Sequence, residues 1–261
     1  MTIKDQLNTA LSFPTAPKRI ISLVPSLTEL LCDLGLTDRI VGVTKFCVHP
    51  ESIRDQATVI GGTKKIDLKL SSELNPDFVL ASKEENLKHQ VKPFSEKGVS
   101  VYTSNIGNFD DLKQVIEDLG AIFEIQSKAA SLIYQLNEQL KIIEQIKLKK
   151  SINAAYLIWK SPYMAAGGDT FISYMLNKVG IKNAFAENDR YPVITEEDLK
   201  KENIDLILLS SEPYPFKSSH IQELADISKK KAILVDGEFF SWYGSRILHM
   251  QDYLEQLTTE L

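Results

Sequence analysis

One short sequence pattern occurs twice in this chain and constrains its fold. Asn75–Ser82 reads NPDFVLAS and Asn203–Ser210 reads NIDLILLS. The first copy follows an Asp-Leu-Lys triplet at Asp67–Lys69, and the second follows the same triplet at Asp198–Lys200. An apolar run behind a polar turn is typical of a buried strand in a parallel sheet. Two copies in the same order predict two similar halves.

The first fifty residues show the pattern of strands and helices clearly. Arg19–Val24 is an apolar run of strand type, Leu27–Leu34 carries leucines at helical spacing, and Ile40–Val43 is a second strand. Ser26 and Glu29 have the spacing of a capping box. A strand, a helix and a strand predict a parallel sheet, because parallel neighbours need a long crossover. The same reasoning predicts strands at Phe78–Ala81, Val99–Thr103, Ala154–Trp159, Leu206–Ser210 and Ala232–Val235, and helices at Leu87–Lys97, Thr170–Lys178, Ile221–Ile227 and Ser245–Leu257.

A long segment without glycine or proline, Ser127–Lys150, lies between the two copies. Its apolar residues form one helical stripe, and a helix of this length spans about 36 Å. We interpret it as a spacer that holds two lobes at a nearly fixed separation, and a helix buried within one domain is the alternative. Lysines near its end complement the helix dipole. The stripe is Leu132, Ile133, Leu136, Leu140 and Ile143, and the lysines are Lys147, Lys149 and Lys150.

The predicted fold class is therefore α/β, with two Rossmann-like lobes joined by one long spacer helix. Each lobe is expected to contain a mainly parallel sheet flanked by helices. The 261 residues are enough for two lobes of about 100–130 residues each. The predicted boundaries are an N-terminal lobe at 1–126, a connecting helix at 127–150 and a C-terminal lobe at 151–261.

The composition excludes several classes of protein. Apolar residues make up 43% of the chain and charged residues 25%, which argues against disorder and fibres. A net charge of −5 argues against a nucleic-acid partner, and two cysteines exclude a disulfide scaffold. No segment has the roughly 20 apolar residues of a membrane span, and the N-terminal residues lack the apolar core of a signal peptide. The sequence as written predicts a cytoplasmic monomer, whereas a removed leader would place the protein in the periplasm or at the cell surface.

The loops that follow the predicted strands are the candidate site, because ligands of open α/β sheets bind at the carboxyl ends of the strands. These loops carry many aromatic and charged residues, including both tryptophans. Such a set favours a pocket for a large flat ligand in a cleft shared by two lobes, although a single ring can also staple a loop. The loops are Thr44–Pro50, Ser82–Asn86, Trp159–Gly168, Ser211–His220 and Asp236–Arg246.

Cys47 and His49 lie two residues apart in the first of these loops. They are candidates for contact with a ligand or a ligand-borne metal, for a nucleophile with its base, and for a structural role. A closed zinc site needs four ligands, and no second Cys/His pair accompanies them. The chain also lacks the common nucleotide-binding, hydrolase and zinc-protease motifs. We therefore predict no catalytic residue, no metal site of the protein's own and no intrinsic cofactor.

Charged residues in the other loops have two interpretations. Lys83 and Glu84 fit both a solvated charge run and a ligand contact at a strand end. Arg246 lies beside loop aromatics and fits both a pair with a ligand carboxylate and a structural ion pair. Gly167 and Gly168 precede a predicted helix, where an anion could bind.

Five stretches of the sequence resemble the periplasmic-binding-protein-like family that carries cobalamin, haem and iron–siderophore complexes. The resemblance covers nearly the whole chain and is greatest to the cobalamin-binding branch, within it to a leaderless subgroup with a Phe-Cys-x-His-Pro loop. It implies two lobes joined by one backbone helix, and a metal chelate bound as solute rather than as cofactor. The stretches are PKRIISLVPSLTELLCDLG (17–35), IVGVTKFCVHP (40–50), IGGTKKIDLKLSSELNPDFVLASKEEN (60–86), GGDTFISYMLNKVGIKNAF (167–185) and ILVDGEFFSWYGSRI (233–247).

The resemblance also implies which residues contact the ligand. The ligand-contact loop of the N-terminal lobe falls on Phe46, and the contacts of the C-terminal lobe fall on Trp159, Tyr163 and the loop with Trp242. Together with the residues from the strand-end loops, the predicted ligand-binding set is Pro25, Ser26, Phe46, Cys47, His49, Lys83, Glu84, Trp159, Tyr163, Glu212, Phe216, Glu238, Trp242, Tyr243 and Arg246.

A membrane permease is the partner that the resemblance implies. In transport members of the family, one surface glutamate of each lobe pairs with arginines of the permease. The position in the C-terminal lobe falls on Glu197, which matches, and the position in the N-terminal lobe falls on Lys69, which has the opposite charge. Glu73 lies one helical turn further and could substitute for it. The reversed charge puts the permease contact in doubt.

Three functions remain open at this point. The leading hypothesis is a solute-binding protein that holds cobalamin or another corrinoid, haem or a ferric siderophore between two lobes, as in ABC-type uptake, with no chemistry of its own. The alternative is a cytosolic cofactor-handling protein or enzyme on the same fold that uses Cys47 and His49. The third is a regulatory protein that senses a ligand and binds another protein. Nucleic acid and membrane insertion are excluded as partners.

Overall fold

The computed structural model of the protein describes residues 1–146, 148 and 150–261. The chain folds into two compact units, and each is described here by itself. Unit 1 contains Met1–Leu136 and a short later segment, Tyr243–Arg246. Unit 2 contains Asn137–Trp242 and Ile247–Leu261. The predicted division at residues 126 and 151 remains a prediction. No sequence pattern indicates that Tyr243–Arg246 packs with the first unit.

Unit 1 is built around a five-stranded sheet in the order β5-β4-β3-β8-β9, in which all neighbouring strands are parallel. The central strands are short runs of Ile, Val, Leu and Phe with both faces buried, which is what a parallel sheet covered by helices requires. The strands of unit 1 are β1 (Thr2–Lys4), β2 (Ala10–Ser12), β3 (Ile20–Ser22), β4 (Ile40–Val43), β5 (Thr58–Val59), β6 (Gly61–Gly62), β7 (Lys65–Ile66), β8 (Phe78–Ser82) and β9 (Ser100–Ser104). Its helices are α1 (Pro25–Asp33), η1 (Thr37–Arg39), α2 (Ile53–Gln56), α3 (Leu68–Glu73), α4 (Lys88–Glu96) and α5 (Phe109–Ile122).

Helix α1 begins differently from the prediction. The predicted capping box of Ser26 and Glu29 is wrong, because the helix starts one residue earlier, with Pro25 in its first turn and Val24 as an N-cap that makes no side-chain hydrogen bond. Proline fits this position because it has no N–H to satisfy and its φ is already helical. The helix ends as predicted at Gly35, whose φ of +76° allows the closing turn.

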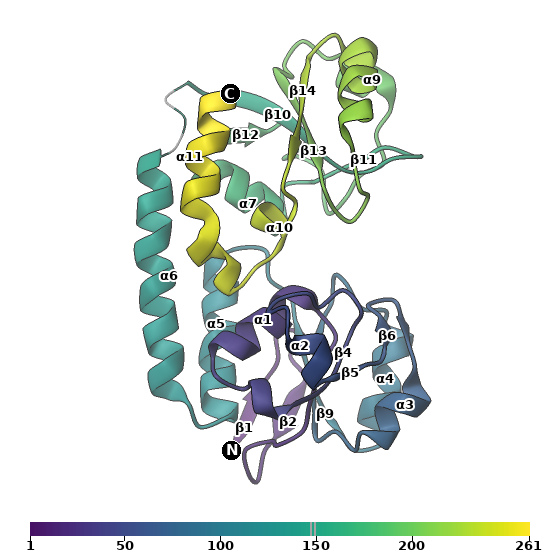
Figure 1. Cartoon of the computed structure of the whole chain (residues 1–261), viewed down its shortest axis with the longest axis vertical. Helices are drawn as coiled ribbons and strands as arrows, with labels where there is room; N and C mark the ends of the chain where they lie inside the picture. The colour runs from purple at the N-terminus through teal and green to yellow at the C-terminus, as the bar shows by residue number, and fades with distance from the viewer. Residues whose placement is uncertain (147, 149) are drawn as a thin grey trace. The chain divides into compact units, whose positions relative to one another are not determined.

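Unit 2 contains a second mainly parallel sheet, in the order β11-β10-β13-β14, with β12 pairing β10. β10, β12, β13 and β14 are parallel neighbours, and β11 is antiparallel. In Figure 1, α9 lies on one side of this sheet and α7, α10 and α11 lie on the other. The strands are β10 (Ile152–Trp159), β11 (Met164–Ala165), β12 (Ile181–Asn183), β13 (Leu206–Ser210) and β14 (Lys231–Val235). The helices are α7 (Phe171–Lys178), α8 (Glu196–Leu199), α9 (Ser218–Ser228), α10 (Glu238–Ser241) and α11 (Met250–Glu260). The short helix η2 (Ser245–His249) begins in the later segment of unit 1 and ends in unit 2.

Helix α6 (Gln126–Ile146) is the long helix that the sequence predicts, and the border between the two units falls inside it. It has 21 residues, and Leu136 and Ile143 of its apolar stripe are fully buried. The predicted helix extends to Lys150, whereas the helix of the structure ends at Ile146. Of the lysines predicted to complement its dipole, Lys147 and Lys149 lie outside the described residues.

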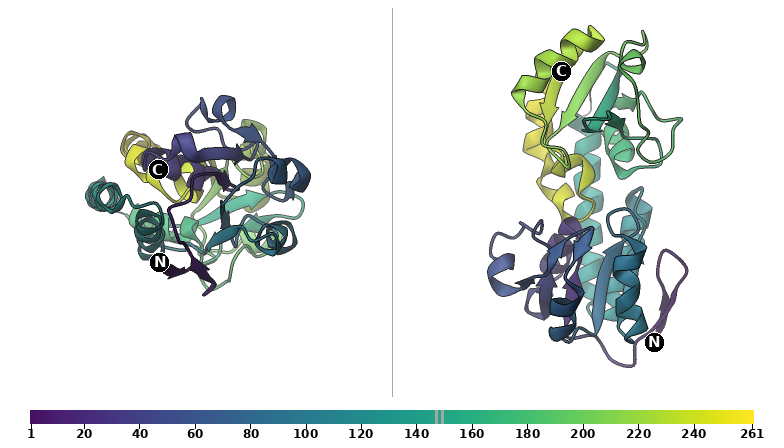
Figure 2. Two further views of the ribbon diagram at one scale, coloured as in Figure 1. Left: turned by 90° about the horizontal axis from the view of Figure 1, so that it is seen from below. Right: turned by 90° about the vertical axis from the view of Figure 1, so that its right-hand side faces the viewer.

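A small hairpin of β1 and β2 precedes the sheet of unit 1, and Figure 2 shows it as the dark purple ribbon next to the N-terminus. Asp5 lies at its turn, and its buried carboxylate accepts hydrogen bonds from the backbone N–H groups of Leu7, Thr9 and Thr103. One acidic side chain thus closes the turn and fixes it to the end of β9. Neither strand of this hairpin is among the predicted elements.

Unit 1 is completed by the segment Tyr243–Arg246, which enters from the far end of the chain. Its backbone passes close to α1, where a Cβ atom on Gly244 would come within 3.3 Å of the Ser26 carbonyl oxygen. Gly244 also has a φ of +128°, which other residues rarely adopt. The segment therefore depends on glycine for both its conformation and its close approach.

Among the described residues, no helix combines the length and the apolar character that crossing a membrane requires.

Candidate functional site

Phe46 is the most exposed ring at the carboxyl ends of the strands of unit 1. It follows β4, and its exposed fraction is 49%. The Lys45 ammonium lies 4.9 Å from the ring centroid, at the distance of a cation–π contact. Gly62 of the β6–β7 hairpin adjoins the ring, and an added Cβ atom there would be 3.3 Å from Phe46 Cε2. The exposed part of the ring offers apolar surface for contact with a flat ligand.

Cys47 faces the opposite way and is completely buried. Its sulfur lies 3.1 Å from Thr28 Oγ1 and 3.3 Å from Thr44 Oγ1. Burial raises the pKa of the thiol above its ordinary value of 9.0, so the reactive thiolate is disfavoured. In this structure the Cys47 side chain packs inside the loop, and its predicted contact with a ligand or a ligand-borne metal remains a prediction.

The remaining predicted residues near β4 and β8 lie closer to the surface. His49 is half-buried, Lys83 is exposed, and the Lys83 N–H donates to the Ser104 carbonyl oxygen. The Glu84 N–H donates to Ser82 Oγ over 3.1 Å, and Oε1 of Glu84 is buried without a hydrogen-bond partner among the described residues. These side chains lie at a strand end, as the sequence predicts, and their contact with a ligand remains a proposal.

The other predicted contacts in unit 1 point into the protein. Tyr243 is buried, and its hydroxyl lies 3.0 Å from Ser82 Oγ. Arg246 forms an ion pair with Glu29, with Nη2 to Oε1 at 2.9 Å, and both side chains are nearly buried. Of the two interpretations of Arg246, the structure contains the structural ion pair. Pro25 and Ser26 are also buried, and the predicted ligand contacts of these two residues, Tyr243 and Arg246 remain predictions.

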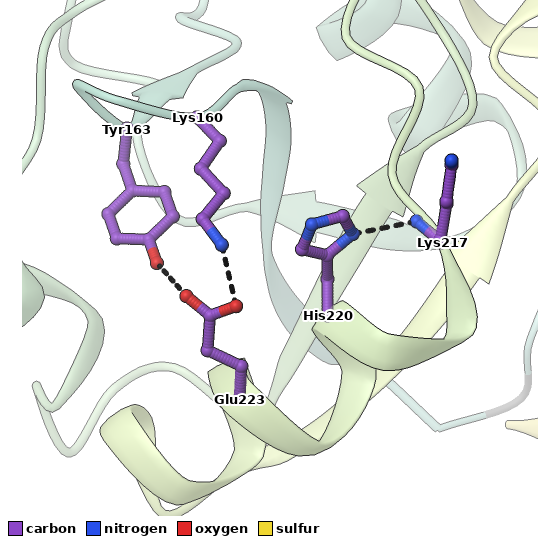
Figure 3. Close-up of polar contacts among 5 residues, drawn as sticks. All are labelled: Lys160, Tyr163, Lys217, His220 and Glu223. Carbon is purple, nitrogen blue, oxygen red and sulfur yellow. Dashed lines mark hydrogen bonds and ion pairs between the residues drawn. The ribbon is translucent and has the colours of Figure 1, made fainter.

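Two polar side chains of the loop after β10 meet one carboxylate in unit 2, as Figure 3 shows. Lys160 Nζ lies 2.6 Å from Glu223 Oε2, and the Tyr163 hydroxyl donates to Glu223 Oε1 over 3.2 Å. Glu223 belongs to α9, so it ties this loop to the helix that follows β13. Burial and the Glu223 charge raise the pKa of Tyr163 to about 12, whereas the Lys160 partner lowers the pKa of Glu223.

An aromatic cluster lies beside these residues. Trp159, the last residue of β10, is 40% exposed, and its ring packs edge-on against Tyr214 at 5.7 Å. Tyr214 in turn contacts Phe216 at 4.8 Å and His220 at 5.8 Å. Phe216 is buried in the core of unit 2, where its ring supports Tyr214, and its predicted ligand contact remains a prediction. Trp159 is the most exposed ring of this cluster, whereas Tyr214 and His220 are half-buried.

His220 lies in the first turn of α9, and its Nδ1 atom accepts a hydrogen bond from the Lys217 N–H over 2.8 Å (Figure 3). Since Nδ1 acts as an acceptor, the neutral ring carries its proton on Nε2. That nitrogen is then a donor, and it has no lone pair for a metal. The ring therefore presents a polar edge rather than a metal ligand.

The second tryptophan is buried rather than open to a ligand. Trp242 is 7% exposed, and its indole Nε1 donates to Glu212 Oε1 over 2.7 Å. Ser241 donates to the same oxygen, also over 2.7 Å. Burial raises the pKa of Glu212 above its ordinary value, against the effect of these donors. In this structure the Glu212 and Trp242 side chains are engaged with each other, and their predicted ligand contacts remain predictions.

Glu238 begins α10 and is half-buried. It lines a pocket of about 500 Å³ between the end of β14 and α11, together with Asp236 and Tyr253. The Glu238 side chain is thus placed beside a hollow of unit 2, and its contact with a ligand remains a proposal.

Gly167 and Gly168 do not form an anion site. Their N–H groups donate to the carbonyl oxygens of Arg190 and Asn188, over 2.7 and 2.8 Å. A Cβ atom on Gly168 would lie 1.9 Å from the Ala186 carbonyl oxygen. These glycines are therefore needed for close packing of two backbone segments. In the described part of the chain, no group of three or more His, Cys, Asp or Glu side chains could hold a metal ion.

Comparison with known proteins decides the family. The family model described as periplasmic binding protein matches residues 20–232. The chain belongs to this family. The resemblance that the sequence suggested is thereby confirmed, and as a member the chain is a solute-binding protein.

Two relatives and one solved structure illustrate the range of the family. The chain is 31% identical over 216 residues to YvrC of Bacillus subtilis (strain 168), described as an uncharacterized ABC transporter substrate-binding lipoprotein; the match covers 80% of the chain and 68% of YvrC. It is 27% identical over 193 residues to the vitamin B12-binding protein of Vibrio campbellii, covering 72% and 69%. The fold superposes on the periplasmic haem-binding protein RhuT of Roseiflexus sp. RS-1 with a TM-score of 0.78 and 19% identity, over 93% of the chain and 97% of RhuT.

The residues predicted to contact a permease are at the surface of this family member. Glu197 in α8 has an 81% exposed side chain, and Lys200 Nζ lies 2.7 Å from its Oε1 atom. Lys69 and Glu73 are both exposed on α3. The Lys69 N–H donates to the Asp67 side chain, the N-cap of this helix.

Several residues of the site were not found by sequence reasoning. They are Lys45, Gly62, Lys160, Tyr214, His220 and Glu223. Four of them lie in the strand-end loops or at the start of the next helix, so their position was a usable signal. Gly62 and Glu223 had none, since a glycine in a hairpin and a glutamate inside a helix are ordinary.

Proposed function

We propose that this protein binds a corrinoid such as cobalamin as its solute, at the carboxyl ends of its parallel strands. The observation that carries the proposal is the surface around Trp159, where an exposed ring adjoins polar side chains that are already bonded to one another. Such a surface offers apolar contact and hydrogen bonds, and the charge of Lys160 is already paired with that of Glu223. A large flat chelate whose metal is already coordinated fits this chemistry.

The hydrogen-bond donors near Trp159 disfavour chelates whose metal must be coordinated by a side chain of the protein. Haem iron is commonly held by His, Cys, Met or Tyr side chains of the protein. Here Tyr163 keeps its proton on the side of Glu223, and His220 has Nδ1 engaged with the Lys217 N–H. A corrinoid brings the ring nitrogens and an axial base for its cobalt within the ligand itself, so it makes no such demand.

The charge around Trp159 also bears on ferric siderophores, many of which are anionic. A site for an anion usually offers Arg or Lys side chains without a carboxylate partner. Lys160 is instead paired with Glu223, with 2.6 Å between Nζ and Oε2. The similarity to a vitamin B12-binding protein supports the same choice of ligand.

Binding to cobalamin, haemin and a ferric siderophore tests the proposal directly. Titration of the purified protein with each compound, followed by tryptophan fluorescence and calorimetry, should give saturable one-to-one binding with cobalamin and much weaker binding with the other two. Haemin or the siderophore as the tightest ligand, or no saturable response to cobalamin, would refute the choice.

We also propose a permease of the ABC type as the protein partner, contacted through α8 and α3. Exposed Glu197 supports a contact with a basic residue of the partner, and Glu73 is the acidic candidate on α3, since Lys69 carries the opposite charge. Membranes containing the matching permease should bind the wild type and bind Glu197→Lys more weakly. Equal binding of the two would refute this docking site.

The similarity to a substrate-binding lipoprotein supports a location at the outer side of the cytoplasmic membrane. The alternative, drawn from the sequence as written, is the cytoplasm. Fractionation of cells that express the native gene, with immunoblotting of each fraction, separates the two locations.

A further inference from the structure

Glu223 links the helix α9 to the loop that follows β10, and it does so through both carboxylate oxygens. Oε2 lies 2.6 Å from Lys160 Nζ, and Oε1 accepts a hydrogen bond from the Tyr163 hydroxyl over 3.2 Å. Figure 3 shows both side chains turned toward this one carboxylate. The Lys160 side chain is 22% exposed and that of Glu223 is 39% exposed, so the cluster lies at the edge of the unit rather than in its core.

Tyr163 would be a capable metal ligand without this neighbour. A tyrosine phenolate binds ferric iron strongly, and it is one of the axial ligands that proteins use for haem. The phenolate forms more readily beside a cation, because the positive charge stabilises its negative charge. Lys160 supplies an ammonium group that shares the same carboxylate, so the chemistry for an activated tyrosine is present.

We propose that Glu223 determines ligand specificity by binding the Tyr163 hydroxyl and neutralising Lys160, so that this tyrosine cannot coordinate the metal of a chelate. The inference rests on the proposed function, since it explains how the surface formed by Lys160, Tyr163 and Glu223 disfavours haem-like ligands. The carboxylate acts in two ways on the same phenol: it holds the proton in a hydrogen bond, and it cancels the ammonium charge nearby.

The electrostatics of Tyr163 agree with this arrangement. Burial, the Glu223 charge and its hydrogen bond all raise the pKa of Tyr163, and Glu196 and Tyr214 act in the same direction. The result is a pKa of about 12, which keeps the phenol protonated at every physiological pH. Without the Glu223 charge, burial, Glu196 and Tyr214 still raise the pKa of Tyr163. The ammonium group of Lys160, no longer paired with Glu223, lowers it.

The first test needs no ligand. The phenolate absorbance of Tyr163 is the difference between pH titrations of the wild type and of Tyr163→Phe. The same difference is then measured between Glu223→Gln and the double variant Glu223→Gln with Tyr163→Phe. We expect the titration midpoint to fall by at least one pH unit in Glu223→Gln. Asp226→Asn is the matched control, since Asp226 lies on the same helix and contacts Gln222, and it should leave the midpoint unchanged. An unchanged midpoint in Glu223→Gln, or an equal fall in Asp226→Asn, would overturn the proposal.

The second test uses ferric haem as the probe. The wild type should give no phenolate-to-iron charge-transfer band, Glu223→Gln should give one, and the double variant Glu223→Gln with Tyr163→Phe should lose it. A band in the wild type, or none in Glu223→Gln, would overturn the proposal. Failure of cobalamin to bind would refute the proposed function, yet it would leave the tyrosine titration and the haem spectra as they are, so the two failures are distinguishable.

Discussion

Trp242 Nε1 donates a hydrogen bond to Glu212 Oε1 over 2.7 Å, and Ser241 donates to the same oxygen. The residues are 30 positions apart, so the bond fixes the loop after β13 to the end of α10. This tryptophan was expected from the sequence to stack on a ligand. With 7% of its surface exposed, it contributes to the stability of the protein instead.

Replacing Trp242 should therefore lower stability. Trp242→Ala removes a large buried ring and should reduce the free energy of unfolding by about 3–5 kcal/mol. Trp242→Phe keeps most of the ring but removes the donor to Glu212, and it should cost about 1–3 kcal/mol. Denaturant unfolding of both variants measures the losses. Wild-type stability combined with loss of ligand binding would contradict this role and restore the expectation from the sequence.

The raised pKa of Glu212 predicts a pH-dependent contribution to stability. Because its pKa is higher in the folded protein than its ordinary value of 4.5, the folded state favours the protonated form. The stabilising contribution is complete below about pH 4.5 and is lost as the pH rises through the folded value. Glu212→Gln is neutral at every pH and should gain stability relative to the wild type between pH 4 and 7. A constant difference over this range, from unfolding at several pH values, would contradict the prediction.

Gly62 should control the position of Phe46. In Gly62→Ala the new Cβ atom lies 3.3 Å from Phe46 Cε2 and 3.7 Å from Lys45 Cε, and both are side-chain atoms that can move. Displacing the ring from its preferred rotamer costs about 0.5–1.5 kcal/mol, so cobalamin affinity should fall about 2- to 12-fold with little change in melting temperature. In a Phe46→Ala background, Gly62→Ala should have no further effect. An equal effect in both backgrounds would show that Gly62 does not act through this ring.

Trp159 is the ring most suited to direct contact in unit 2. Trp159→Ala should weaken cobalamin binding by about 1–3 kcal/mol, which is about 5- to 150-fold, as is common for an aromatic contact that becomes buried on binding. Tyr134→Ala is the control, since Tyr134 is 66% exposed on α6, away from the strand ends. Calorimetry measures both affinities. Losses of similar size in the two variants would remove Trp159 from the site.

The Glu29–Arg246 ion pair should behave as a buried pair. Arg246→Met leaves the Glu29 carboxylate without its guanidinium partner and should cost about 3–5 kcal/mol of stability. The double variant Glu29→Leu with Arg246→Met should lose less than the single variant, because no buried charge is left behind. Chemical unfolding of the two variants tests the order, and a larger loss in the double variant would contradict it.

Much of the fold could be predicted from the sequence because its central elements have long local signals. β4 has the predicted bounds, and β10, β13 and β14 agree within two residues, since each is an apolar run behind a polar turn. The elements that were missed are short or far from any pattern. β11 has two residues, and it exists because it pairs with Leu157 and Trp159 of β10.

The site was harder to predict than the fold. Trp159 ends a strand and Phe46 follows one, and both rings are exposed, as expected for residues at strand ends. The burial of Trp242 was not predictable, because a loop aromatic can face inward when a partner such as Glu212 lies on another loop. Glu223 lies 63 residues from Lys160 in the sequence, and no local sequence pattern predicts a contact between residues so far apart in the chain.

The return of Tyr243–Arg246 to unit 1 limits how the gene can be divided. A clone that stops after residue 136 would encode every strand of the first sheet, yet it would lack the tyrosine, glycine and arginine that cover the start of α1. Anyone preparing the first unit alone for crystallography or NMR would have to graft those four residues back onto it, or accept a protein in which Glu29 has lost its ion pair with Arg246.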